Sequence, residues 1–361
     1  MKNTISMHQA GVLAFFSILI NKMLFLPSSM YKDAKADAIF SVIILFALEF
    51  CTLWIFFRLK RKFPDKRLHD ILKEYLSVYV AKIIFFLLMV FVLFKAILTF
   101  SIVYVYFKQQ IYQGEFVWIA LVACVAVLSH GVICGLRPMV RTMEALLSIA
   151  LTGFIFCLVI SLFTPISTPT FFESSIISIF SSLYKYAFIF GDFIVLYIII
   201  DKIEYKKSEE KKVYFLAILG MVLVLSLFFL FYSKYQVTAF MHNNALADLL
   251  VFSVQFNAVG RLDIVAMLTI MMITLFHMEI YCYLFCDSFT SVFPLLNKRY
   301  AVVVFNVLFL LLYYVFIGKY ETMISSTTIW LPVIGLIVGY VLPLICLIIS
   351  LIKRRKHEKN D

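Results

Sequence analysis

Two charged residues lie inside apolar stretches of this sequence, where an ordinary membrane anchor carries none. Lys22 lies within FFSILINKMLFLPSS, and Asp192 follows Gly191 within YKYAFIFGD. A charged side chain in hydrocarbon costs roughly 2.5–3.5 kcal/mol on insertion scales, so such a residue needs a partner or a polar cavity. An ammonium group and a carboxylate in two interrupted apolar segments have the chemistry to bind a zwitterion, which requires opposite charges or oriented dipoles when it leaves water.

Two interpretations stay open for each of these charges. Lys22 could face a cavity, where it pairs with a ligand carboxylate or takes the place of a coupling cation; alternatively, it snorkels or pairs internally with Glu49 or Asp192. Gly191 and Asp192 could form an unwound turn that offers backbone groups and a carboxylate to an ammonium group. The alternative for this pair is a glycine that packs two helices beside an interhelical aspartate.

Other polar and aromatic residues extend this candidate site. Lys95 lies in the middle of an apolar segment with Thr99 one helical turn further on, so the two could line a polar path or belong to an internal pair. Pro27 lacks a backbone donor and interrupts a helix. The candidate ligand-binding residues are Asn21, Lys22, Lys95, Thr99, Tyr186, Phe190, Gly191 and Asp192, and the candidate structural or gating residues are Pro27, Arg261 and Asp263.

The sequence contains no motif on which a catalytic mechanism could rest. P-loop, GxGxxG, GxSxG, HExxH and paired-cysteine patterns do not occur. His277 and Glu279 are two residues apart and do not share a helix face, which argues against a metal site. We therefore expect a protein that is not an enzyme and that uses neither a cofactor nor a metal.

The composition places the chain in a membrane. Hydrophobic residues make up 63% of the 361 residues and the mean hydropathy is +1.00, far above the values of soluble domains. The net charge of +11 comes from basic residues between apolar segments, which is typical of membrane orientation and not of a nucleic-acid-binding surface. We expect a single polytopic transmembrane domain over residues 1–361, with no nucleic-acid partner.

About 20 apolar residues are needed to cross a bilayer, and on this basis the sequence predicts ten transmembrane helices. Their expected ranges are 9–30, 38–58, 81–107, 116–134, 144–163, 182–200, 213–233, 262–286, 300–318 and 328–352. Five helices per half would place the halves in opposite orientations, with inverted repeats over about 9–163 and 182–352. Helices 1 and 6, which carry the interruptions, would then correspond.

The charges of the loops predict the orientation of the chain. Alternate loops, beginning at the N-terminus, hold 22 of the 32 Lys and Arg residues, whereas the intervening loops hold five. Cytoplasmic loops retain positive charge during insertion, so both termini are predicted to be cytoplasmic.

Two loops have a structure of their own. In one positively charged loop, residues 66–79 place apolar residues at helical spacing between charges, which predicts a short amphipathic helix. Residues 164–181 are rich in Thr, Ser and Pro and are expected to form an outer surface loop.

Several short motifs follow one another along nearly the whole chain. They are ISMHQ, LPS, DAIFSV, KFPDKRLHDIL, FGD and GRLDIV. In this order and spacing the chain resembles the B subunit of spore nutrient-germinant receptors, the endospore germination permease family of the amino acid-polyamine-organocation superfamily. The resemblance implies a LeuT-like fold, a nutrient such as an amino acid bound between broken helices 1 and 6 and helices 3 and 8, partner A and C subunits, and the spore inner membrane.

Two functions from different classes fit these observations. The leading hypothesis is a ligand-sensing receptor subunit that triggers germination, and the alternative is a stand-alone transporter of an amino acid or another small solute with a cation. Composition and topology do not separate them, because both need the same pocket. Accumulation of a labelled amino acid by proteoliposomes that hold only this chain would favour the transporter.

Overall fold

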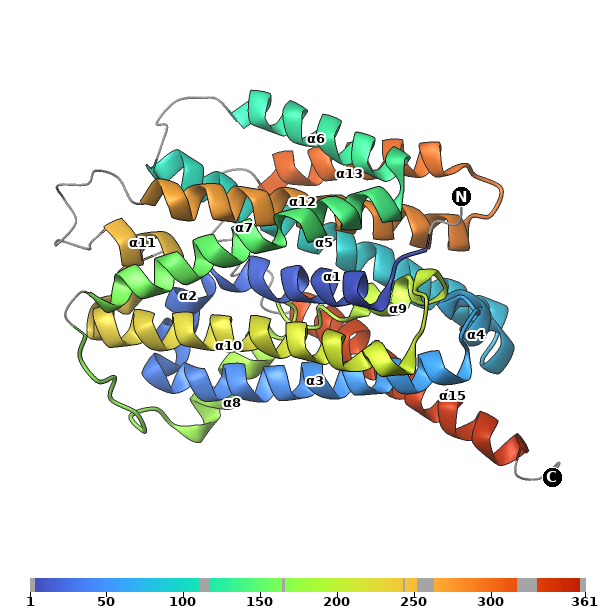
Figure 1. Cartoon of the computed structure of the whole chain (residues 1–361), viewed down its shortest axis with the longest axis horizontal. Helices are drawn as coiled ribbons and strands as arrows, with labels where there is room; N and C mark the ends of the chain where they lie inside the picture. The colour runs from blue at the N-terminus through green and yellow to red at the C-terminus, as the bar shows by residue number, and fades with distance from the viewer. Residues whose placement is uncertain are drawn as a thin grey trace.

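The computed structural model describes residues 4–110, 117–163, 166–242, 244–251, 263–316 and 330–357. These residues form a bundle of helices (Figure 1). Within these ranges β-pairing is confined to an isolated bridge between Ile5 and Ile203. The helical membrane fold expected from the composition is therefore confirmed.

The described helices follow one another along the chain in the order that Figure 1 colours from blue to red. They are α1 (Met7–Leu19), η1 (Ile20–Lys22), α2 (Leu26–Ala34), η2 (Lys35–Asp37), α3 (Ala38–Lys62), α4 (Leu68–Tyr75), α5 (Val78–Gln110), α6 (Val117–Cys134), α7 (Leu136–Leu162), α8 (Ile176–Tyr186), α9 (Ile194–Ile198), η3 (Ile200–Lys202), η4 (Lys207–Glu209), α10 (Glu210–Tyr235), η5 (Gln236–Met241), α11 (Ala245–Val251), α12 (Asp263–Val292), α13 (Lys298–Phe316), helical residues 330–336, the π-helical turn η7 (Ile337–Val341) and α15 (Leu342–His357).

Seven helices in the described ranges are long and apolar enough to cross a membrane. They are Leu26–Lys62, Val78–Tyr104, Leu136–Leu162, Lys207–Met241, Leu268–Val292, Lys298–Val315 and Trp330–Ile352, and the apolar helices Met7–Leu19 and Leu121–Cys134 are shorter. The chain is thus an integral membrane protein with several spans. Three of the ten expected spans are not among these seven: the first and the sixth, because each is divided into shorter pieces, and the fourth, which is represented by the shorter apolar helix Leu121–Cys134.

The first interruption lies where the sequence predicts it, between α1 and α2. The helix tightens to 3₁₀ geometry at η1, bends over residues 23–25 and resumes with Pro27 in the first turn of α2, where a missing backbone donor is tolerated. Carbonyl groups freed by the bend are bound by the start of α11, because the amides of Ala245 and Leu246 donate to the carbonyl oxygens of Leu24 and Met23 at 3.0 and 3.1 Å.

The second interruption separates α8 from α9. α8 ends at Tyr186, the chain passes through turns, and Gly191 adopts a φ of +78° before α9 begins at Ile194, a backbone conformation that L side chains rarely adopt. Every residue of α9 is buried. α8 itself begins at Ile176, so the surface loop expected over 164–181 ends earlier and the helix starts before residue 182.

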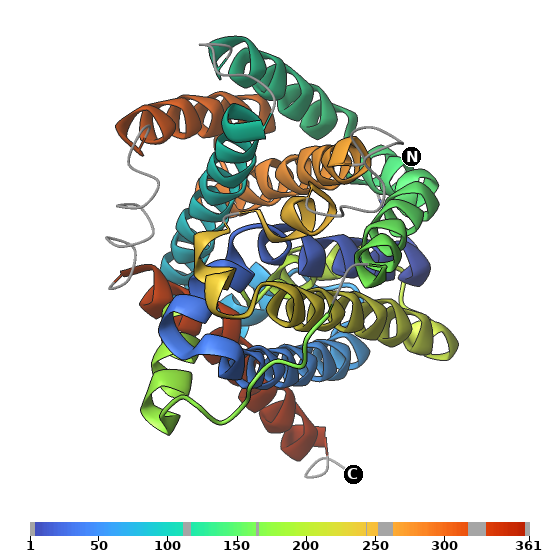
Figure 2. The ribbon, with the colours of Figure 1, turned by 90° about the vertical axis from the view of Figure 1, so that its left-hand side faces the viewer.

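The two interrupted helices lie in the interior of the bundle. α1 packs on α10, α7 and α12, and α12 packs in turn on α5, α6, α7 and α13. The view along the bundle in Figure 2 shows α1 between α10, α7 and α12. In Figure 1, α2, α8 and α11 lie at the left end, whereas the start of α1 and the end of α15 lie at the right end. The breaks therefore lie between two distinct ends of the bundle.

The predicted amphipathic helix after the second apolar segment is present as α4. Its apolar residues Leu68, Ile71 and Leu72 are buried, and the helix packs on α5. In Figure 1 α4 lies at the same end as the start of α1 and the end of α15. This is the position expected of a short surface helix that covers the end of a bundle.

Candidate functional site

The two charges that the sequence analysis singled out meet in the structure. The Lys22 ammonium group donates to Oδ2 of Asp192, and the Lys95 ammonium group donates to Oδ1 of the same carboxylate. At most 1% of any of these three side chains is exposed. Of the two interpretations left open for Lys22, internal pairing with Asp192 is the arrangement that the structure has, and Lys95 belongs to the same group.

Glu49 of α3 completes this group, which we call the central cluster: Lys22, Glu49, Lys95 and Asp192. Its Oε1 lies 3.9 Å from Nζ of Lys22 and accepts from the amides of Gly191 and Asp192 at 2.8 and 3.1 Å. Two ammonium groups thus face two carboxylates, so the formal charges balance among side chains that are almost fully buried. From the sequence Glu49 was only a possible partner of Lys22, although an acidic residue within an apolar segment is a signal for such a site.

The ammonium groups of the central cluster also donate to backbone carbonyl oxygens next to the helix breaks. Lys95 donates to Ile189 and Phe190 at 3.2 and 3.0 Å, and Lys22 donates to Ile18 at 3.2 Å. A buried ammonium group has three donors, and an unpaired one is costly. The unwound backbone between α8 and α9 is therefore part of the binding surface that holds Lys95.

Aromatic rings enclose the ammonium groups of the central cluster. The Lys22 Nζ lies 4.6 Å from the centroid of the Phe190 ring and 5.7 Å from that of Phe46, and the Lys95 Nζ lies 5.0 Å from that of Phe91. Ring faces attract cations at these distances, more strongly where water is absent. Phe190 thus lies in the site as the sequence analysis expected, in contact with a protein ammonium group.

Asn21 and Thr99 join the two sides of the site next to the central cluster. The Thr99 hydroxyl lies 2.8 Å both from Oδ1 of Asn21 and from the carbonyl oxygen of Lys95, and with one proton it donates to one of them at a time. Both side chains are buried. This contact ties η1 to α5 at the first helix break.

Tyr186 lies outside the central cluster. Its hydroxyl donates to Oδ2 of Asp33 at 2.8 Å, and Lys185 pairs with the same carboxylate at 2.8 Å. These contacts connect the end of α8 to α2. Pro27 also serves α2, because its carbonyl oxygen accepts from the Tyr232 hydroxyl at 2.9 Å.

Two candidates, Arg261 and Asp263, and the pair His277 and Glu279, whose spacing argues against a metal site, remain to be placed. Arg261 lies outside the described residues, and Asp263 begins α12 without a described side chain. His277 is buried, with its ring centroid 4.3 Å from that of Tyr281, while the Glu279 carboxylate faces Gly131 of α6. In the described part of the chain no group of three His, Cys, Asp or Glu residues has the geometry of a metal site.

At the end of the bundle where α1 begins, hydrogen bonds and ion pairs join the segment before α1 to the segment after α9. The amide of Ile5 donates to the carbonyl oxygen of Lys202 at 2.8 Å, and the amide of Glu204 donates to that of Ile5 at 2.9 Å. Lys202 forms an ion pair with Asp287 of α12, and Arg67 lies 3.6 Å from Asp201. The segment that follows α9 is thereby fixed to the N-terminal segment and to α12.

Two comparisons with known proteins bear on this arrangement. The model of a family described as spore germination protein matches residues 4–321, which is most of the chain. A search of curated proteins found no match. The match covers both helix breaks and every residue of the central cluster.

Proposed function

The chain belongs to the family of spore germination proteins, and from this premise we propose that it is the nutrient-sensing subunit of a spore germinant receptor. In this proposal it binds a small zwitterion, such as an amino acid, at the two helix breaks and acts with A and C subunits in the spore inner membrane. Both termini lie in the cytoplasm, in agreement with the alternation of loop charges. We propose no catalytic step.

The central cluster supports the ligand class. The carboxylate of Asp192 is held between two ammonium groups of the protein itself. A carboxylate is also the group that binds the ammonium group of a ligand most strongly. When such a ligand replaces Lys22 at Asp192, the freed Lys22 can pair with the ligand carboxylate. This exchange keeps the number of buried positive and negative charges equal, so it avoids the cost of an unpaired buried ion.

The helix breaks support a conformational role for the same exchange. Lys22 is in η1 at the first break, and Asp192 follows the positive-φ Gly191 at the second, so their ion pair fastens the two interrupted helices together. Inverted repeats over 9–163 and 182–352 would relate these helices, and ligands of such folds bind where discontinuous helices meet. Opening the Lys22–Asp192 pair would release the two breaks to move relative to each other, which is the signal we propose.

Germination of spores tests this function directly. Spores that lack the gene for this chain should lose their response to at least one amino acid, and the wild-type gene should restore it. Asp192→Asn should restore neither the response nor its dependence on ligand concentration. Normal germination of the deletion strain with every amino acid tested would contradict the proposal.

A transporter that couples a solute to a cation is the second candidate, and the buried ammonium group of Lys22 favours it. This group lies beside two carboxylates and the Ile18 carbonyl oxygen, which are ligand types that a coupling cation also uses. Proteoliposomes that contain only this chain distinguish the candidates. Accumulation of a labelled amino acid above its outside concentration would establish transport, whereas binding without accumulation agrees with sensing.

A further inference from the structure

A cavity lies away from the central cluster, at the end of the bundle where α2 and η5 meet. Its volume is about 570 Å³, within the range of small-molecule sites. We call it the outer pocket; it is lined by Tyr31, Lys32, Lys35, Ala36, Pro169, Thr170, Glu173, Tyr232, Gln236, Val237 and Phe240. These residues come from α2, η2, the loop before α8, the end of α10 and η5.

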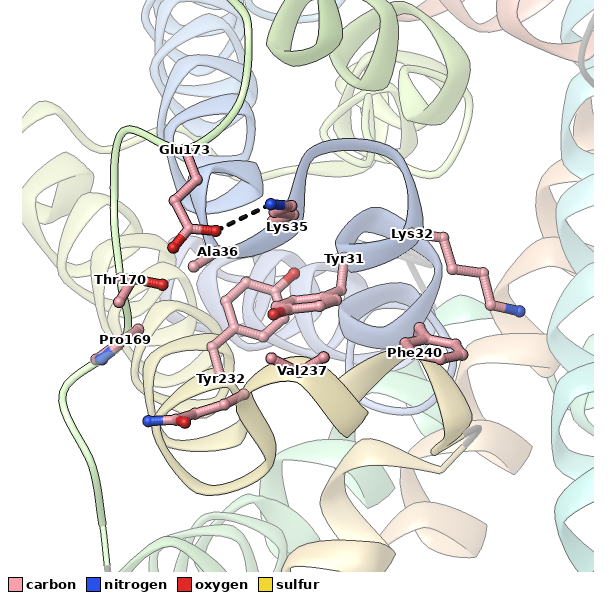
Figure 3. A pocket seen from close by; sticks show the side chains of 11 residues that line it. Tyr31, Lys32, Lys35, Ala36, Pro169, Thr170, Glu173, Tyr232, Val237 and Phe240 are labelled. Atoms are coloured by element: carbon pink, nitrogen blue, oxygen red, sulfur yellow. Dashed lines mark hydrogen bonds and ion pairs between the residues drawn. The ribbon is translucent and has the colours of Figure 1, made fainter.

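The outer pocket has separate groups for an anion, a cation and an apolar side chain. Lys35 and Glu173 pair at 3.0 Å along one side, with 57% and 42% of their side chains exposed, and Lys32 extends along another side past Phe240 (Figure 3). The ring of Tyr31 lies between these charged groups. One ammonium group and one carboxylate thus lie beside an aromatic surface, whereas the Lys32 ammonium group points away from them.

Glu173 is held in its ionised form. The Thr170 hydroxyl and the Lys35 ammonium group hold the pKa of Glu173 below its usual range, because both stabilise the carboxylate. A partly exposed ion pair of this kind contributes little to stability. It can therefore open to accept the opposite charges of a ligand at small cost.

The backbone around the outer pocket is strained. Among the described residues, three that are not glycine have positive φ, and all three lie at or beside this pocket: Lys35 at +47°, Gln236 at +42° and Phe172 at +65°. Asp37 fixes the backbone at Phe172, because its carboxylate accepts hydrogen bonds from the amides of Phe172 and Ser174 at 2.6 and 2.7 Å. Such conformations are kept where the surrounding structure requires them, and they gather at ligand sites.

The outer pocket is connected to the first helix break. Tyr232, which lines the pocket, donates to the carbonyl oxygen of Pro27, and the Ser28 hydroxyl donates to that of Phe240 at 3.3 Å. α2 begins directly after the break and carries the pocket residues Tyr31 and Lys32 on the same short helix. A molecule that binds in the pocket therefore contacts the helix whose other end leads to Lys22.

We propose that the outer pocket is a second binding site for a small zwitterion with an apolar side chain, in which the carboxylate binds Lys35, the ammonium group binds Glu173, and the side chain packs on Tyr31 and Phe240. Both binding groups and the apolar surface are present in one cavity, and the strained residues hold them. The position of this site on the outside of the membrane rests on the proposed function. Its ligand chemistry does not.

Protection of a cysteine tests the outer pocket apart from the central cluster. Val237 lines the pocket with an exposed side chain, so Val237→Cys in a background without the exposed cysteines Cys51 and Cys134 gives a site for a maleimide. L-phenylalanine and L-leucine should slow labelling of the purified full chain in nanodiscs. Phenethylamine and 3-phenylpropionate, which each lack one charged group, should protect about tenfold less well, the loss that one charge-assisted hydrogen bond explains.

Variants assign the protection to its site. Lys35→Met and Glu173→Gln should each weaken it about tenfold, whereas Asp192→Asn should leave it in place. A cysteine at Tyr79, which is exposed in the first turn of α5 away from the pocket, should label at the same rate with and without the amino acids and controls for their effect on the maleimide reaction itself. The proposal would be overturned if neither amino acid protected the cysteine. It would also be overturned if Asp192→Asn abolished the protection while Lys35→Met and Glu173→Gln left it unchanged. If the proposed receptor function fails while protection persists, the outer pocket stands as a binding site.

Discussion

Gly191 and Gly339 touch backbone to backbone: a Cβ atom on Gly191 would lie only 3.1 Å from the Cα of Gly339. Gly339 belongs to the π-helical turn η7, and Gly335, one turn earlier, packs as closely on Phe188. The last long helix thus lies directly on the unwound segment that presents Asp192. Two glycines are needed there because no side chain fits between the two backbones.

Replacing Gly335 with alanine should destabilise the protein. Its new Cβ would lie 2.5 Å from the Cα of Phe188, and overpacking against backbone costs about 1–3 kcal/mol. Gly220→Ala is the matched control, because its Cβ would contact the Phe15 side chain at an ordinary 3.4 Å. Thermal unfolding in detergent measures both variants. Equal melting temperatures for the two would show that the contact between the last helix and the break is not tight.

The central cluster predicts unequal effects of its single variants. Asp192→Asn leaves Lys22 and Lys95 without their shared carboxylate, and removing one partner of a buried ion pair costs about 3–5 kcal/mol. Lys22→Met should cost less, because Lys95 still pairs with Asp192.

The double variant Lys22→Met/Asp192→Asn should recover much of the stability that Asp192→Asn loses, because one ammonium group and one carboxylate remain in the central cluster. Melting temperatures and yields of the four proteins form a double-mutant cycle. Losses that simply add would mean that the two side chains do not interact. Ligand response should be lost in all three variants, including the double variant whose fold is recovered.

Stability should depend on pH through Asp248 of α11. Burial raises the pKa of Asp248 to about 6 from its ordinary 3.8, so the folded state binds a proton more tightly than the unfolded state does. Stability should therefore increase as the pH falls from about 7 through 6 toward 4, and ionisation above pH 6 should remove up to about 3 kcal/mol. The difference in melting temperature between wild type and Asp248→Asn, measured across this range, isolates the effect. A difference that does not change with pH would rule it out.

This titration should also reach the first helix break. α11 carries Asp248 and binds the carbonyl oxygens of Met23 and Leu24. Hydrogen exchange at the amides of Ala245 and Leu246 should therefore be slower at pH 5.5 than at pH 7.5 after correction for intrinsic rates. Asp248→Asn should remove the difference.

Labelling from each side of the membrane tests the orientation. Thr168 and Lys207 are both exposed, and the loop charges place them on opposite sides. In a background without Cys51 and Cys134, a membrane-impermeant maleimide added outside should modify Thr168→Cys in intact cells. It should modify Lys207→Cys only after the membrane has been permeabilised. Modification of both from the same side would mean that the predicted topology is wrong.

The sequence by itself determined the features that depend on neighbouring residues. Apolar length gives the membrane helices, Pro27 and the adjacent Asn21-Lys22 pair mark the first break, and Gly191 marks the second, because a missing donor or a positive φ acts within one turn of chain. The spacing of Leu68, Ile71 and Leu72 determined α4 in the same way.

Only the tertiary structure decided which partners these residues have. Asp192 binds Lys22 and Lys95, 170 and 97 residues away along the chain, and Tyr186 binds Asp33 of α2 instead of joining them. An apolar segment shows that a charge needs a partner, but the choice among several partners depends on which helix faces meet when the bundle packs. For the same reason no pattern in the sequence indicated the outer pocket, whose walls come from α2, η2, the loop before α8, the end of α10 and η5.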